Sequence, residues 1–286
     1  MKFVTVASRL NHLDRLATIA EEEILRSVGS HQPALYHLRA GGHRMRLTTC
    51  LNACLALSLE DQDSVALACC IELLHNASLI HDDLQDNDEI RRGHPTVWAK
   101  YGKNIAICSG DLLLTKAFGV LSTMTTTAPL AVILSEVQDS VSETIQGQCE
   151  DLSLTHSTSA IEYENIAARK SGPFIAMPLT LPLIAGGYTQ SVVPAKQAVR
   201  CFAIAYQIAD DIGDWQADAE HGHLNLVNIY RSKNNLNLSI SMARQRALYL
   251  SRRCQKELQA LPENCAIGII NAAKSIQSKL ERIEHE

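Results

Sequence analysis

The sequence has few aromatic residues and little excess charge, and each shortage excludes a class of protein. Phe, Trp and Tyr make up 5% of the 286 residues, whereas β-sheets favour aromatic and β-branched side chains. The formal net charge of −5 argues against a nucleic-acid partner, because nucleic-acid-binding proteins carry basic surfaces. No apolar run approaches the roughly 18 residues that a membrane-spanning helix needs. We therefore expect a helical protein without a transmembrane segment.

The cysteines give no sign of disulfides or of zinc. There are nine, none in a CxxC pair, and no set of Cys and His residues has the spacing of zinc ligands. Free buried thiols are typical of the reducing cytoplasm. Residues 1–9 contain too little apolar sequence for a secretory signal. We therefore predict a cytoplasmic location.

Helical hydrophobic periodicity runs through most of the chain, between short loop signals. Strict alternation with period 2 is nearly absent, and no Gly-rich phosphate loop follows a strand. The pattern predicts one all-α domain over residues 1–286 rather than an α/β nucleotide fold. The expected helices lie near 9–27, 34–40, 44–59, 64–86, 98–102, 104–123, 130–152, 160–169, 171–186, 195–215, 236–260 and 266–284.

Two aspartate clusters have the same spacing. Residues 82–86 read DDLQD and residues 210–214 read DDIGD, so each places carboxylates at i, i+1 and i+4. On a helix, like charges at i and i+4 share a face and repel by roughly 0.2–0.5 kcal/mol. Mg²⁺ would relieve this repulsion, because one or two carboxylates plus substrate phosphates commonly hold it. We expect each cluster to end a buried helix and the two clusters to hold one polyphosphate.

Basic residues near the first cluster favour a phosphate site over the simpler alternatives. Alone, the cluster fits a solvated helix end equally well. An EF-hand loop is excluded because Leu84 occupies a ligand position and the sixth position is not glycine. Arg91 and Arg92 follow closely, and the planar guanidinium group suits phosphate. Residues 41–46, GGHRMR, precede a predicted helix, whose free N–H groups attract anions.

In this order, the motifs resemble the trans-isoprenyl diphosphate synthases, or polyprenyl synthetases, which include farnesyl and geranylgeranyl diphosphate synthases. The resemblance covers about residues 30 to 230. It rests on the GGxRxR segment, the two aspartate motifs, Arg91-Arg92-Gly93, Lys170-Ser171 and Gln207. It implies an all-α, isoprenoid synthase-type helical bundle around a central cavity, a homodimer and a site for three Mg²⁺ ions.

The resemblance also implies a reaction and a role for each motif residue. Isopentenyl diphosphate would be condensed with an allylic diphosphate. The catalytic residues would be Asp82, Asp83, Asp86, Lys170, Gln207, Asp210 and Asp211. The metal ligands would be Asp82, Asp83, Asp86, Asp210, Asp211 and Asp214. The residues contacting the allylic diphosphate would be Arg91, Lys170 and Ser171. The residues contacting isopentenyl diphosphate would be His43, Arg46, His75 and Arg92, while Gln207 would line the reacting centre.

The expected product length follows from the residues before the first motif. In the family, bulky aromatics four or five residues before the first Asp stop chain growth early. Here these positions are the small residues Ala77 and Ser78, with Leu73 and Leu74 one turn deeper. This open floor predicts geranylgeranyl diphosphate (C20) or a neighbouring length. Neither the preferred allylic primer nor the exact length can be deduced from the sequence.

Two lysines typical of the family are histidines here, which keeps other functions open. His43 replaces the lysine that meets isopentenyl diphosphate, and the loop after the second motif has His223 instead of a lysine. Histidine is only partly charged near pH 7. One alternative is a terpene cyclase-like lyase that ionises an allylic diphosphate without isopentenyl diphosphate. A second is a non-catalytic subunit of a heteromeric synthase, although such subunits typically lose aspartates that are present here.

Restoring the lysine tests the first replacement. We expect His43→Lys to lower the KM for isopentenyl diphosphate, because a full positive charge then faces the diphosphate at pH 7. Steady-state kinetics with isopentenyl diphosphate as the varied substrate measures this effect. An unchanged or higher KM contradicts the interpretation.

Overall fold

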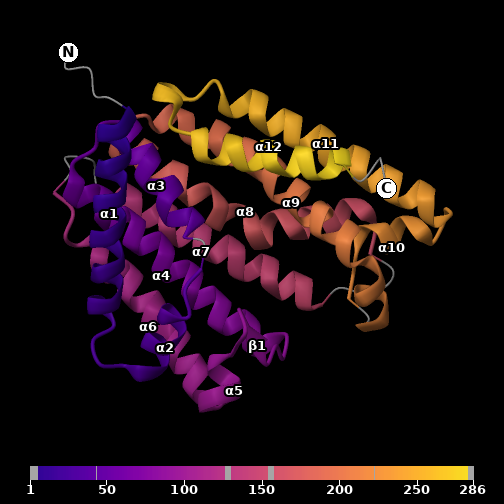
Figure 1. The fold of residues 1–286 in the computed structure, drawn as a ribbon, viewed down its shortest axis with the longest axis horizontal. Helices are drawn as coiled ribbons and strands as arrows, with labels where there is room; N and C mark the ends of the chain where they lie inside the picture. Colours follow the sequence, from indigo (N-terminus) through magenta and orange to yellow (C-terminus); the bar gives the residue numbers. More distant parts are fainter. Residues whose placement is uncertain (1–5, 43, 126–129, 154–157, 222, 283–286) are drawn as a thin grey trace. The chain divides into compact units, whose positions relative to one another are not determined.

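Helices dominate the computed structural model, which describes residues 6–42, 44–125, 130–153, 158–221 and 223–282 (Figure 1). These residues form twelve α-helices, two single 3₁₀ turns and one hairpin of two-residue strands, so the all-α prediction is confirmed. The helices of the first half are α1 (Val6–Ser27), α2 (Gln32–Arg39), α3 (Met45–Ala56), α4 (Asp61–Gln85), α5 (Val97–Tyr101), α6 (Lys103–Leu121) and α7 (Leu130–Leu152). The remaining helices are α8 (Ala160–Ala185), α9 (Val192–His221), α10 (Leu226–Arg231), α11 (Leu236–Leu258) and α12 (Ile267–Arg282).

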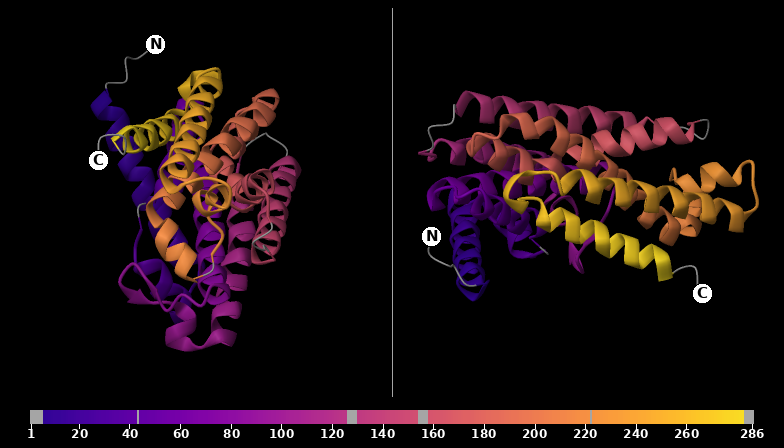
Figure 2. Two further views of the ribbon diagram at one scale, coloured as in Figure 1. Left: turned by 90° about the vertical axis from the view of Figure 1, so that its right-hand side faces the viewer. Right: turned by 90° about the horizontal axis from the view of Figure 1, so that it is seen from above.

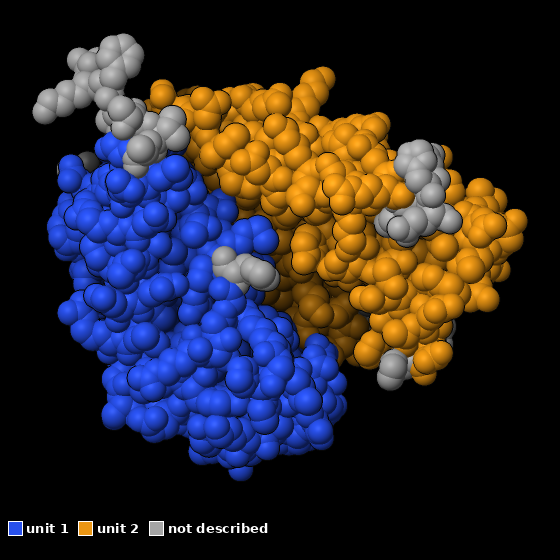
Figure 3. Space-filling view, viewed as in Figure 1, with its two compact units in different colours: residues 1–134, 184–187 blue, residues 135–183, 188–286 orange. Residues whose placement is uncertain are grey.

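The chain divides into two compact units, coloured separately in Figure 3. Unit 1 comprises residues 1–134 and 184–187, and unit 2 comprises residues 135–183 and 188–286. The first aspartate motif therefore belongs to unit 1 and the second to unit 2. The single domain predicted over residues 1–286 and its central cavity stay predictions.

Unit 1 is built around α4. Helices α1, α3 and α6 pack against it, and buried side chains occur all round it from Ala66 to Ile80. The predicted buried helix before the first motif is thereby confirmed. Asp61 and Asp63 lie in the first turn of α4, where carboxylates interact favourably with the helix dipole. The helix ends at Gln85 with Asp86 as its C-cap, so the first motif does end a helix.

Unit 2 is built around α9 and α11, which pack together along their lengths. Helices α11 and α12 lie side by side, as Figures 1 and 2 show. Helices α7 and α8 approach each other closely at Gly147. A Cβ atom at this position would lie 2.4 Å from the backbone nitrogen of Lys170, so only glycine permits the approach. This contact places the backbone of Lys170 beside Gly147 of α7.

Two boundaries predicted in unit 2 are wrong. Separate helices were expected over 160–169 and 171–186, because Ser171, Gly172 and Pro173 resemble a break. Instead, α8 is continuous and contains Pro173, Pro178 and Pro182. Each proline removes one helical hydrogen bond, but most residues from Gly172 to Ile184 are buried, so packing against neighbouring helices holds the segment.

The second aspartate motif does not end its helix, contrary to the expectation. Helix α9 continues beyond Asp214 to His221, because residues 215–221 contain good helix formers and no proline. Gly213 is tolerated inside the helix. Helix α10 and the hairpin of β1 (Ile90–Arg91) and β2 (His94–Pro95) were not predicted, because they are too short to show a hydrophobic period.

Within the residues that the structure describes, two helices are apolar enough, by length and composition alone, to cross a membrane. They are α4 and α6, and 72% and 39% of their most apolar stretches are buried in the protein. Neither stretch is an uninterrupted apolar run, because both include occasional polar residues. The expectation concerned uninterrupted apolar runs of roughly 18 residues, and this finding does not contradict it. Core helices pass the same criterion, so it is weak evidence for a membrane span.

Candidate active site

The first aspartate motif has two solvent-accessible carboxylates and one buried carboxylate. Asp82 is half-buried and Asp86 is exposed. Because they are four positions apart, they lie on one face of α4. Asp83 is only 1% exposed, and its Oδ1 accepts a hydrogen bond from Arg91 Nε at 2.5 Å. Burial raises the pKa of Asp83, and Arg91 opposes this shift. Asp83 therefore ties the hairpin that carries Arg91 to the end of α4.

The second motif repeats this arrangement in unit 2. Asp211 is 2% exposed and accepts hydrogen bonds from three protein donors. The Tyr163 hydroxyl donates at 2.7 and 2.9 Å, the Gln207 amide at 3.1 Å and the Leu226 backbone N–H at 2.8 Å. Burial raises the pKa of Asp211 to about 6, although these donors act in the opposite direction. Asp211 thus connects α8, α9 and α10.

Asp210 and Asp214 are the accessible carboxylates of the second motif. Asp210 is half-buried and Asp214 is exposed, and they share one face of α9. Burial raises the pKa of Asp210; nearby Lys279 lowers it, and the like charge of Asp214 raises it further. A cation between these two carboxylates would remove that repulsion.

The accessible pair in each motif suits Mg²⁺. In the described part of the chain, no three His, Cys, Asp or Glu side chains converge as a complete metal cage. Mg²⁺ does not require one, because it is often bound by one or two carboxylates and completes its shell with phosphate oxygens and water. The predicted ligand roles of Asp82, Asp86, Asp210 and Asp214 fit this preference. Those of Asp83 and Asp211 stay predictions, and protein donors already occupy oxygens of both side chains.

The predicted isopentenyl diphosphate residues of unit 1 lie around α4. Arg46 Nη1 is 3.2 Å from His75 Nε2. Burial lowers the pKa of His75 well below its usual value, and Arg46 and Arg92 lower it further. The imidazole is therefore neutral at pH 7, and Nε2 accepts the hydrogen bond from Arg46. This bond places two predicted ligands of one diphosphate next to each other.

Arg92 lies against the glycine pair of the GGxRxR segment. It occupies the hairpin turn at a positive φ of 53°. A Cβ atom at Gly42 would be 2.7 Å from the Arg92 guanidinium, and the φ of Gly42 is 151°, so no other residue fits easily. Burial, then Arg91 and Arg44, lower the pKa of Arg92. His43, the next residue after Gly42, lies outside the described residues, so its predicted contact stays a prediction.

In unit 2, the predicted allylic-site lysine forms an ion pair. Lys170 Nζ is 2.6 Å from Asp151 Oδ2, and both side chains are about one-third exposed. Ser171 is half-buried beside it, and Gln207 is bound to Asp211 as described above. His223, the second replaced lysine, is 70% exposed, and its Nδ1 is 3.7 Å from Asp218.

The predicted chain-length residues differ in burial. Leu73, Leu74 and Ala77 are at most 3% exposed, whereas Ser78 is half-buried and its hydroxyl donates to the His75 carbonyl at 2.9 Å. One turn further on, the His81 ring lies against Gly110 of α6, where an added Cβ would be 2.2 Å from Nε2. Helix α6 therefore covers part of α4 directly below the aspartates.

Two residues that organise these sites were not predicted from the sequence. Tyr163 holds Asp211, and Glu72 holds Arg44 through an Nη1–Oε1 bond of 2.7 Å. Tyr163 precedes Lys170 by seven residues, which places both on one face of α8. That spacing was the available signal. For Glu72, a charged residue in an otherwise apolar helix was the signal, because buried charges are nearly always paired.

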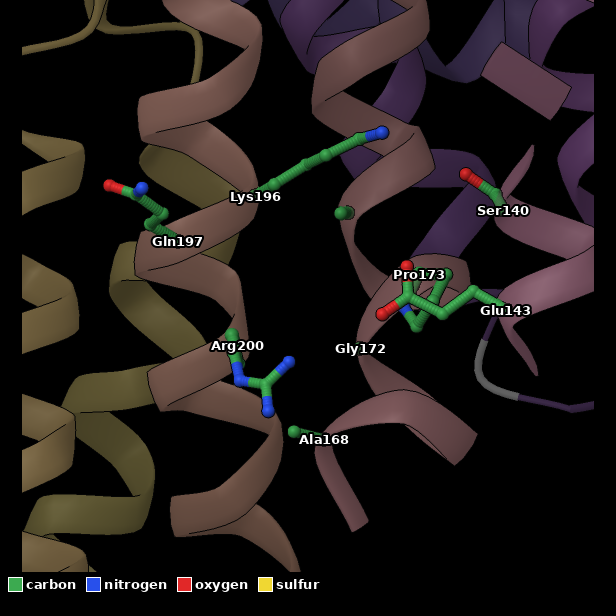
Figure 4. Close-up of a pocket in the computed structure, with 9 residues that line it drawn as sticks. Ser140, Glu143, Ala168, Gly172, Pro173, Lys196, Gln197 and Arg200 are labelled. Atoms are coloured by element: carbon green, nitrogen blue, oxygen red, sulfur yellow. The ribbon is translucent and has the colours of Figure 1, made fainter. Parts of the chain in front are cut away.

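A separate cavity of about 240 Å³ lies between α7, α8 and α9 of unit 2 (Figure 4). Its lining consists of Ser140, Glu143, Ala168, Gly172, Pro173, Ala176, Lys196, Gln197 and Arg200. Gly172 follows Lys170 by two positions, and residues two apart on a helix point in nearly opposite directions. The cavity therefore lies on the other side of α8 from Lys170, and its lining includes none of the predicted site residues.

Comparisons with known proteins show the family of this chain. The family model for polyprenyl synthetase matches residues 29–245, and the chain belongs to this family. It is a trans-isoprenyl diphosphate synthase, that is, a trans-prenyltransferase of isoprenoid biosynthesis. The chloroplastic geranylgeranyl pyrophosphate synthase of Capsicum annuum is 30% identical over 277 residues, covering 92% of this chain and 74% of that protein.

Solved structures support the same assignment. The geranylgeranyl pyrophosphate synthetase of the archaeon Geoglobus acetivorans superposes with a TM-score of 0.81 at 25% identity, covering 93% of this chain and 99% of that one. The corresponding enzyme from Pyrococcus horikoshii has a TM-score of 0.83 at 24% identity, covering 93% and 98%, and shares the fold.

Burial of His37 makes stability depend on pH. His37 is 5% exposed, and burial, followed by Arg92 and Arg91, lowers its pKa from 6.5 to about 4. Between these values the unfolded chain binds a proton that the folded protein does not. Hence this histidine makes the free energy of unfolding decrease as pH falls from 6.5 to 4, by at most about 1.4 kcal/mol per pH unit.

Urea unfolding at several pH values measures this dependence. We expect His37→Gln to reduce the slope of unfolding free energy against pH in that window. The matched variant His94→Gln, at an exposed histidine, separates loss of a buried imidazole from loss of any histidine. Equal slopes for wild type and His37→Gln would show that His37 is protonated in the folded protein.

Proposed function

We propose that this prenyltransferase condenses isopentenyl diphosphate with an allylic diphosphate in a Mg²⁺-dependent reaction, with geranylgeranyl diphosphate as product. The observation that carries the proposal is the pair of accessible carboxylates in each motif, together with cations in the same unit. Asp82 and Asp86 belong to unit 1 with Arg46 and Arg92, and Asp210 belongs to unit 2 with Lys170. Carboxylates bind the metal, and cations bind the diphosphates.

The residues of unit 1 would hold isopentenyl diphosphate. Arg46 and Arg92 would bind its phosphate oxygens, and His75 would keep Arg46 in place by accepting its hydrogen bond.

The allylic diphosphate would meet other cations. Arg91 donates a hydrogen bond from Nε to Asp83, and its two remaining nitrogens would reach the allylic diphosphate. In unit 2, Lys170 would exchange Asp151 for a phosphate oxygen. Clustered positive charge stabilises the departing diphosphate.

The reaction exchanges one bond for another. The C–O bond of the allylic diphosphate breaks, and the double bond of isopentenyl diphosphate attacks the resulting carbocation to form a C–C bond. One proton then leaves to the released diphosphate. When bound at Asp82, Asp86, Asp210 and Asp214, Mg²⁺ supplies Lewis-acid stabilisation of the leaving group. Asp83 and Asp211 would keep the surrounding side chains in place through their hydrogen bonds.

The product length is proposed from the small residues below the first motif and from the relatives' names. Ala77 and Ser78 are small residues about one turn before Asp82, and the relatives in Capsicum annuum and Geoglobus acetivorans are both called geranylgeranyl pyrophosphate synthases. A C20 product agrees with both observations. The homodimer, the three metal ions and the cytoplasmic location remain predictions from the sequence.

An incubation of purified protein tests the proposed reaction. The protein is mixed with Mg²⁺, isopentenyl diphosphate and, in turn, dimethylallyl, geranyl or farnesyl diphosphate, and the products are sized by mass spectrometry. We expect a C20 diphosphate, and none in the presence of EDTA. Elongation to another length keeps the reaction class and overturns the product assignment.

Hydrocarbon or alcohol release without chain growth would instead identify the cyclase-like lyase. Activity that appears only after a second synthase is added would identify a heteromeric enzyme. The variant Asp82→Asn keeps the side-chain shape but removes the charge, so we expect it to abolish elongation if the motif binds metal. The exposed Asp139→Asn in α7 is the matched control.

Product length is tested by narrowing the space below the first motif. We expect Ala77→Phe and Ser78→Phe to shift the product from C20 to a shorter diphosphate, because an aromatic ring takes up the space that the growing chain needs. Product sizing by mass spectrometry reads out the change, and a melting curve checks that each variant folds. An unchanged distribution from both folded variants places the cavity floor elsewhere.

A further inference from the structure

Helix α4 has a buried polar stripe, which we define as Glu72, Asn76 and Asp83. These residues are 3%, 1% and 1% exposed. Their spacings of four and seven residues place them on one face of the helix. Most other buried residues of α4 are apolar, and a buried polar group costs free energy unless it is hydrogen-bonded. The polar stripe therefore needs an explanation.

Each member of the polar stripe binds a different segment of unit 1. Glu72 Oε1 accepts from Arg44 Nη1 at 2.7 Å, and Asp83 binds Arg91. Asn76 donates to Glu72 Oε1 at 3.1 Å and interacts with the His37 side chain of α2, whose pKa it raises. The bound segments are α2, the start of α3 and the hairpin. Two of these segments carry the cations assigned to the diphosphates.

Arg44 is held at several points. Its Nη2 donates to the Leu38 carbonyl at 3.1 Å, and its Nε lies 3.5 Å from the exposed Glu21. Its backbone adopts a left-handed conformation, with φ 47° and ψ 28°, immediately before α3. Such a conformation is strained for a non-glycine residue, so the surrounding contacts must hold it. Arg46, two residues later, then reaches His75.

Stability does not account for the Glu72–Arg44 pair. Desolvation of a buried ion pair roughly cancels its Coulombic attraction, so an apolar pair of similar size would serve stability as well. In addition, Glu72 Oε2 is buried without a hydrogen-bond partner in the part of the chain that the structure describes. An interaction with little net stability but a fixed geometry acts mainly through orientation.

We propose that Glu72 is a positioning residue for the isopentenyl diphosphate site. By holding Arg44, it fixes the turn between α2 and α3, so that Arg46 meets His75 and the glycine pair stays beneath Arg92. The inference rests on the proposed function, because it assigns Arg46, His75 and Arg92 to isopentenyl diphosphate. Glu72 itself does not touch the substrate.

Two matched variants test the role of Glu72. Glu72→Gln keeps the side-chain shape and removes the charge that holds Arg44, whereas Glu21→Gln removes the exposed carboxylate beside the same arginine. We expect Glu72→Gln to raise the KM for isopentenyl diphosphate about tenfold, with less than about threefold change in kcat and in the KM for the allylic diphosphate. Glu21→Gln should leave all three unchanged. A purely structural defect would instead lower kcat and affect both substrates.

A binding measurement tests the role of Glu72 independently of the proposed reaction. Calorimetry with isopentenyl diphosphate alone involves no turnover, and we expect Glu72→Gln to weaken its binding about tenfold as well. If wild type binds isopentenyl diphosphate but makes no elongated product, the proposed reaction fails. The ratio of the isopentenyl diphosphate affinities of wild type and Glu72→Gln still decides the role of Glu72. Equal affinities for wild type and a folded Glu72→Gln overturn the positioning role alone. Wild type that does not bind isopentenyl diphosphate overturns both.

A second variant covers the case in which Glu72→Gln does not fold. Arg44→Lys keeps the charge opposite Glu72, but a lysine cannot donate to Glu72 and the Leu38 carbonyl through a rigid fork. We expect the same selective rise in the KM for isopentenyl diphosphate. If both single variants fold, the double variant should be no weaker than either one, because the two residues act as one unit. Additive losses, or an unchanged KM in Arg44→Lys, contradict the proposal.

Discussion

Repulsion between like charges is the constraint on which this structure depends. In unit 1, burial lowers the pKa of Arg92, His37 and His75, and the positive charges of neighbouring arginines lower all three further. In both motifs, burial raises an aspartate pKa and neighbouring carboxylates raise it further. Clusters of like charges do not increase the stability of the folded chain. They become favourable when a metal-bound diphosphate supplies the opposite charges to both groups at once.

The protein limits this repulsion by giving the members of each motif different surroundings. The second aspartate of each motif is buried and bonded to protein donors, Asp83 to Arg91 and Asp211 to Tyr163. The first and third aspartates stay accessible and share a helix face. The same division occurs among the arginines of unit 1, where Arg44 is bound to Glu72 while Arg46 and Arg92 lie near His75 and Gly42. In each case a buried partner orients the neighbours that are available to substrate.

Much of this arrangement could be predicted from the sequence, because it is local. Hydrophobic periodicity gave the long helices, and the i, i+1, i+4 spacing identified both motifs and their shared faces. The end of α9 was misplaced because charged residues after a motif resemble a helix end, although no residue there prevents a helix. Glu72 and Tyr163 were missed since their partners lie 28 and 48 positions away. No local pattern reports which distant side chain a buried charge will meet.

The most direct test of this account is whether diphosphate binding requires the metal and both motifs. Thermal unfolding can be followed with inorganic pyrophosphate, with and without Mg²⁺, in wild type and in Asp86→Asn and Asp214→Asn. The account predicts that pyrophosphate raises the melting temperature of wild type only when Mg²⁺ is present, and that each variant loses most of that increase. An equal increase in EDTA, or an undiminished one in both variants, would contradict it.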